Sequence, residues 1–223
     1  MTAVIDDGED FLAKWRRRWP EWRIGMAFVA PSEQARVEAW FALLDEFTDA
    51  AWGGADPTPG LAKLAWWQEE LQGWARGARR HPLATTLQRL DAPWQTLALA
   101  LRVLPATREA ASDPADTAQQ LRDLARAIDA CEARLFGDPA ATGAAESALV
   151  APLLAARACL HGDRAEAQAL LAAWPASGLG RRSRRIANAI LAGRLRGLAR
   201  SGQARPARGP ATLWASWRAA RAR

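Results

Sequence analysis

Apolar side chains recur at helical spacing between residues 32 and 52, and no alternating pattern of a β-strand recurs along the chain. The composition is rich in Ala, Leu and Arg, which favour helices. With 223 residues, the chain is long enough for one domain with its own core. We therefore predict an all-α protein with a single domain. The apolar stripe comprises Val37, Trp40, Phe41, Leu44, Phe47 and Ala51.

Helix caps, prolines and glycines divide the chain into a series of predicted helices. Ser32 is the expected N-cap of the helix that carries the stripe, and Gly137 is expected to end a later long helix. No internal repeat is present. The predicted helices span residues 9–18, 32–52, 58–76, 81–90, 93–104, 114–136, 144–160, 164–174, 183–200 and 213–220.

The cysteines and the first residues predict a cytoplasmic protein. Cys131 and Cys159 are the only cysteines, which is no disulfide framework and fits a reducing compartment. The acidic start of the chain, residues 6–10, does not fit a signal peptide. No apolar run approaches the roughly 20 residues of a membrane span.

The formal net charge is +6, and almost all of the positive charge is Arg. Much of it lies after residue 180, where the run 181–185 is dense in Arg. A basic region of this kind contacts anionic membrane lipid or nucleic acid, or it is simply a solvated face. We expect peripheral contact with an anionic membrane ahead of nucleic acid, because no nucleic-acid-binding motif frames the arginines.

Asp45 and Asp49 lie on the flank of the apolar stripe, four residues apart. A helix brings their side chains onto one face, about 6 Å apart. Glu38 lies on the same edge, and Glu46 points further round the helix. Two carboxylates at this spacing repel unless a cation joins them, and Mg²⁺ takes one or two carboxylates together with substrate phosphate oxygens. The alternative interpretation is a solvated acidic edge.

Two adjacent tryptophans, Trp66 and Trp67, lie on the predicted helix over 58–76. Adjacent residues on a helix point roughly 100° apart. One ring can therefore enter the core while the other lines a cavity or its rim. The alternative is that both rings simply pack in the interior.

Together, these segments resemble the squalene/phytoene synthase family over residues 27–87. Their order and spacing carry the resemblance more than any one segment. A weaker resemblance continues over residues 117–137. The matching segments are Ala27-Phe28-Val29, Leu44-Asp45-Glu46-Phe47-Thr48-Asp49, the run from Lys63 to Leu71 with its Trp pair, and His81-Pro82.

The resemblance implies an isoprenoid-synthase-like helical bundle over residues 1–203, followed by a basic tail with a short helix over 204–223. Active members are transferases of isoprenoid biosynthesis, which join two prenyl diphosphates with Mg²⁺ held by two aspartate-rich motifs. By resemblance, Asp45 and Asp49 bind Mg²⁺. The substrate site, which takes a prenyl diphosphate or another isoprenoid lipid, would include Lys63, Trp66 and Trp67.

The second aspartate-rich motif of the family has no counterpart here. The helix expected near 148–160 contains no carboxylate between Glu146 and Asp163, and the chain has no Tyr. Two interpretations therefore stay open. The chain is a prenyltransferase with half of the metal apparatus, or it is a non-catalytic paralogue (a pseudoenzyme) that binds lipid or assembles with a partner at a membrane. A basic nucleic-acid-binding helical protein is a third, weaker interpretation.

Overall fold

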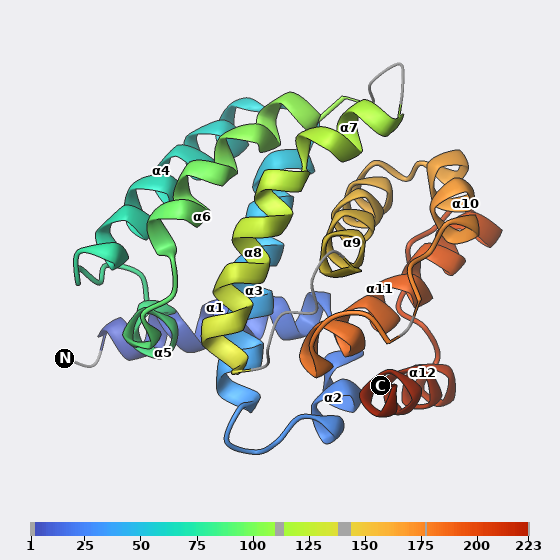
Figure 1. Ribbon diagram of the computed structural model, residues 1–223, viewed down its shortest axis with the longest axis horizontal. Coiled ribbons are helices and arrows are strands. Elements are labelled where there is room, and N and C mark those ends of the chain that lie inside the picture. Colours follow the sequence, from blue (N-terminus) through green and yellow to red (C-terminus); the bar gives the residue numbers. More distant parts are fainter. Residues whose placement is uncertain (1–2, 110–113, 138–143, 177, 223) are drawn as a thin grey trace. The chain divides into compact units, whose positions relative to one another are not determined.

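The structure is a computed structural model that describes residues 3–109, 114–137, 144–176 and 178–222 (Figure 1). These residues form α-helices and short 3-10 helices, and none of them lies in a β-strand. The predicted all-α class is therefore confirmed. The chain divides into two compact units, one of Met1–Arg18 with Ser32–Gly137 and the other of Trp19–Pro31 with Asp138–Arg223.

The first unit is built from pairs of packed helices. In Figure 1, α4 and α6 lie side by side, and the two helices are in contact. The long helix predicted over 114–136 is divided at Leu121 into two helices, and it ends as predicted at Gly137, whose positive φ of 68° favours glycine. The elements are α1 (Ala3–Arg18), α3 (Gln34–Trp52), α4 (Thr58–Ala75), α5 (Ala84–Leu87), η2 (Gln88–Leu90), α6 (Trp94–Ala100), η3 (Leu101–Thr107), α7 (Pro114–Gln120) and α8 (Arg122–Phe136).

The prediction that Ser32 caps the long helix was wrong. Residues 31–33 form a turn, and α3 begins after Glu33, which makes no side-chain cap hydrogen bond. Five of the six positions of the predicted stripe are buried, whereas Leu44 is only partly buried and its neighbour Leu43 is completely buried. A helix that contacts neighbours on more than one side buries residues beyond a single stripe.

Tryptophan rings fill the interior of the first unit. Trp40 donates its indole N–H to Glu132 Oε1 at 2.8 Å, which joins α3 to α8. Trp74 packs against Trp94 with ring centroids 5.1 Å apart. Such rings supply large apolar areas in fixed edge-to-face contacts. The tryptophans that are almost completely buried here are Trp40, Trp52, Trp67, Trp74 and Trp94.

A buried ion pair joins two segments of the second unit. Arg194 donates to both carboxylate oxygens of Glu21, at 2.7 and 2.8 Å, and its guanidinium lies 3.7 Å from the ring centroid of Trp19. A bidentate pair of this kind fixes residues 19–31 against α11. The elements are α2 (Trp22–Gly25), η1 (Met26–Phe28), α9 (Ala144–His161), α10 (Arg164–Ala172), α11 (Arg182–Ser201) and α12 (Gly209–Arg221).

The basic end of the chain forms α12, which packs against α11 and α2. The boundary between a domain over 1–203 and a tail over 204–223 stays a prediction. Within the described residues, no helix has the length and apolar character that a bilayer crossing requires.

Candidate functional site

Asp45 and Asp49 converge on one cationic group, the guanidinium of Arg18. Arg18 is the last residue of α1, and its Nη1 lies 2.8 Å from Asp49 Oδ1 and 3.7 Å from Asp45 Oδ2. Burial alone would lower the pKa of Arg18, but the neighbouring carboxylates outweigh this effect and raise the pKa above its ordinary value. The helix therefore does bring both aspartates onto one face, as predicted, and an arginine joins them.

As arranged, the two aspartates fit a guanidinium better than Mg²⁺. Arg18 lies at the point on which Asp45 and Asp49 converge, and a divalent cation there would meet its positive charge. Among the described residues, no group of three or more His, Cys, Asp or Glu side chains could hold a metal ion. Mg²⁺ at Asp45 and Asp49 thus stays a prediction, and it requires Arg18 to move away.

The acidic row of α3 comprises Glu38, Asp45, Glu46 and Asp49. Its two other members, Glu38 and Glu46, also pair with basic side chains. Arg16 of α1 binds Glu38 in a bidentate contact, with Nη2 2.7 Å from Oε2, and the hydrogen bond with Glu38 is the main cause of the raised pKa of Arg16. Lys63 of α4 forms an ion pair with Glu46. Each carboxylate of the row therefore has a basic partner from a neighbouring helix.

The two adjacent tryptophans of α4, Trp66 and Trp67, point in different directions, as helical geometry predicts. Trp67 is 1% exposed and contacts Phe47, with ring centroids 5.6 Å apart, while Trp66 is 38% exposed. The indole N–H of Trp67 is buried and has no hydrogen-bond partner among the described residues. Lys63, Trp66 and Trp67 thus lie on one helix beside the acidic row, and their role in substrate binding stays a prediction.

His81 lies against the tryptophan pair. Its ring centroid is 4.7 Å from that of Trp67 and 4.9 Å from that of Phe11 of α1. Burial lowers the pKa of His81 below its ordinary 6.5, and this effect outweighs the nearby carboxylates. The ring is therefore neutral near pH 7, with Nδ1 accepting a hydrogen bond from the Leu83 N–H at 3.2 Å. This arrangement suits a packed ring more than a proton donor.

Glu70 is an almost completely buried carboxylate that joins α4 to the following turn. It accepts hydrogen bonds from Trp74 Nε1 and from the His81 N–H, each at 2.8 Å, and from Arg80 through the backbone N–H and Nε. Burial is the largest single influence and would raise the pKa of Glu70, but the hydrogen bonds together lower it. Hydrogen bonds from α4 and the following turn occupy both carboxylate oxygens, which gives Glu70 a structural role.

Helix α9 lies where the resemblance places the second aspartate motif. Leu153, Leu154 and Ala155 of this helix are buried apolar residues. Arg157 of the same helix is buried and paired with Glu166 of α10. This helix therefore presents core side chains where the family carries acidic ones.

Sequence reasoning did not identify Arg16 and Arg18 as partners of the acidic row. The available signal was the run Arg16-Arg17-Arg18 at the end of a helix that precedes the acidic helix. That run alone does not reveal the pairing, because 31 residues separate Arg18 from Asp49. Comparison with protein-family models, curated proteins and solved structures finds no match to this chain.

Proposed function

We propose that this chain is a non-catalytic relative of the squalene/phytoene synthases, which binds an isoprenoid or another lipid at an anionic membrane surface. The observation that carries the proposal is the contact of Arg18 with both Asp45 and Asp49. A prenyltransferase needs these aspartates for metal ions that neutralise a diphosphate leaving group. Here an arginine of the same chain already balances their charge.

The tryptophan interior supports the same proposal. A prenyl chain reacting beside α3 and α4 needs an apolar cavity between them, and Trp40, Trp67 and Trp74 are almost completely buried in that region. Removing metal and diphosphate contacts typically costs orders of magnitude in rate. The interior filled by tryptophan therefore counts against turnover between α3 and α4.

The exposed face of α12 supports membrane contact. Leu213 is 50% exposed and Trp214 is 60% exposed, and Trp214 stacks on Trp217 with ring centroids 4.8 Å apart. The same helix ends in Arg218 and Arg221. Exposed Trp and Leu side chains insert at the headgroup level of a bilayer, and neighbouring Arg side chains are attracted to anionic lipid.

The test is isothermal titration with farnesyl diphosphate, in Mg²⁺ and in a chelator, for the wild type and for Asp45→Asn/Asp49→Asn. We expect binding that is the same with and without Mg²⁺ and is unchanged in the variant. No product should form when two equivalents of farnesyl diphosphate are supplied. Binding that needs Mg²⁺ and is lost in the variant would overturn the non-catalytic proposal and favour a prenyltransferase.

A further inference from the structure

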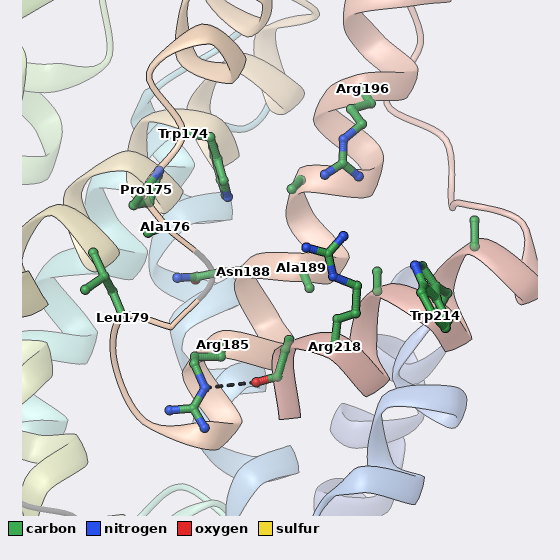
Figure 2. Close-up of a pocket in the computed structure, with 14 residues that line it drawn as sticks. Trp174, Pro175, Ala176, Leu179, Arg185, Asn188, Ala189, Arg196, Trp214 and Arg218 are labelled. Atoms are coloured by element: carbon green, nitrogen blue, oxygen red, sulfur yellow. Dashed lines mark hydrogen bonds between the residues drawn. The ribbon is translucent and has the colours of Figure 1, made fainter. Parts of the chain in front are cut away.

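A pocket of about 400 Å³ lies in the second unit, between α11, α12 and residues 174–176 and 179 (Figure 2). Its volume lies within the range of small-molecule sites, about 300–1,000 Å³. Most of the wall is apolar, and none of the described residues that line it is acidic. The apolar wall comprises Trp174, Pro175, Ala176, Leu179, Ala189, Ala192, Ala211, Trp214, Ala215 and Ala219.

Two arginines at the rim of this α11–α12 pocket lack an anionic partner. Arg196 of α11 and Arg218 of α12 are both exposed and both line the pocket. Figure 2 shows their guanidinium ends extending toward each other. Neither side chain has a hydrogen bond or ion pair to the described residues, in contrast to Arg185, which donates to Ala219 O at 2.9 Å. Two like charges turned toward one another favour an anion between them.

The wall also holds a polar atom that lacks a partner. Asn188 is 8% exposed and lines the pocket, and its Nδ2 donates to Ala148 O at 2.9 Å. Its Oδ1 is buried and has no hydrogen-bond donor among the described residues. A buried acceptor without a donor costs stability, so Asn188 is an incompletely satisfied polar residue in a mostly apolar wall.

We infer that the α11–α12 pocket binds the head of a phosphate-bearing amphiphile, with the phosphate between Arg196 and Arg218 and the chain against the apolar wall. A phosphate monoester carries about two negative charges and three acceptor oxygens near pH 7, which suits two guanidinium groups better than a carboxylate does. The inference deepens the proposed function, since it names a site and a headgroup for the lipid, and it rests on that function for its lipid-binding role.

The experiment is isothermal titration of the full chain with dodecyl phosphate below its critical micelle concentration, beside inorganic phosphate and dodecanol. The test variant is Arg196→Gln/Arg218→Gln. The matched control, Arg182→Gln/Arg205→Gln, removes the same charge from exposed arginines outside the pocket lining. We expect dodecyl phosphate to bind the wild type and the control alike, and the test variant about tenfold or more weakly.

Unfolding temperatures of all three proteins verify that the variants are folded. Equal affinity of the test variant and the wild type for dodecyl phosphate would overturn the claim that Arg196 and Arg218 bind the phosphate. Equal affinity for inorganic phosphate and dodecyl phosphate would overturn the claim that the ligand is an amphiphile. Absence of dodecyl phosphate binding would overturn the inference as a whole. Dodecyl phosphate binding without farnesyl diphosphate binding would support this inference and count against an isoprenoid ligand in the proposed function.

Discussion

Arg18 Nη1 lies 2.8 Å from Oδ1 of Asp49, and this contact joins the end of α1 to the last turns of α3. The same guanidinium also approaches Asp45. An i, i+4 pair of carboxylates that resembles a metal-binding motif is thus part of a helix–helix contact in this chain. The proposal that these aspartates do not hold a metal ion in this chain rests on this relationship.

Replacing Arg18 should destabilise the first unit. We expect Arg18→Gln to lower the free energy of unfolding by about 1 kcal/mol, because it removes a partly exposed ion pair and leaves Asp45 and Asp49 to repel each other. Urea unfolding at low salt measures the change. Arg17→Gln is the control, since Arg17 is exposed and adjacent. Equal free energies of unfolding for the two variants would contradict the structural role of the contact.

Glu70 should make stability sensitive to acid. Its pKa is lowered in the folded state from the ordinary 4.5, so its contribution is fully present above that pH and is lost as the pH falls through the folded-state pKa. Near pH 7, we expect Glu70→Gln to cost about 2–3 kcal/mol, because an amide cannot accept all of the hydrogen bonds. The difference in free energy of unfolding between the wild type and Glu70→Gln should narrow as the pH falls below about 4.5.

Urea unfolding over this pH range measures the gap for Glu70→Gln and for a neighbouring control, Glu69→Gln. Glu69 is exposed, so its replacement should leave the free energy of unfolding nearly unchanged at every pH. A gap between the wild type and Glu70→Gln that stays constant from neutral to acidic pH would contradict the lowered pKa.

Trp67 and Trp74 provide a matched test of the indole hydrogen bonds. Both rings are 1% exposed, but Trp74 donates to Glu70 while the N–H of Trp67 has no partner among the described residues. Replacement by Phe removes a similar apolar area in each case. Trp74→Phe should therefore cost about 1–2 kcal/mol more than Trp67→Phe in urea unfolding. Equal costs would mean that the hydrogen bond from Trp74 to Glu70 contributes nothing to the free energy of unfolding.

The exposed face of α12 should control contact with anionic membranes. We expect Leu213→Ser/Trp214→Ser to reduce binding to phosphatidylglycerol vesicles on the order of tenfold in a flotation assay. The control Leu61→Ser/Leu99→Ser removes two leucines that are each 45% exposed elsewhere in the chain. If both double variants float like the wild type, α12 is not the membrane-binding element.

Local sequence signals predicted most of the helices well. The helix expected over 183–200 is observed as Arg182–Ser201, and the one expected over 144–160 as Ala144–His161. Caps, glycines and apolar spacing act over a few residues, so they can be read from sequence. The start of α3 was missed because the turn over 31–33, rather than the Ser32 hydroxyl, precedes the helix.

The partners of the predicted site residues were not predictable in the same way. Helical spacing placed Asp45 and Asp49 together, but Arg18 reaches them only because α1 packs against α3. The pairing of Lys63 with Glu46 likewise depends on how α3 and α4 approach each other. Contacts between helices distant in sequence depend on tertiary packing, for which a single sequence carries little signal.

The most direct test of the central claim is a titration with Mn²⁺, which takes the same oxygen ligands as Mg²⁺, followed by electron paramagnetic resonance. We predict that the wild type and Asp45→Asn/Asp49→Asn retain the same weak background of bound Mn²⁺. Arg18→Gln should gain a site that is lost when both aspartates are also replaced. Stoichiometric Mn²⁺ binding by the wild type that disappears in Asp45→Asn/Asp49→Asn would contradict the claim that Arg18 takes the place of a metal ion.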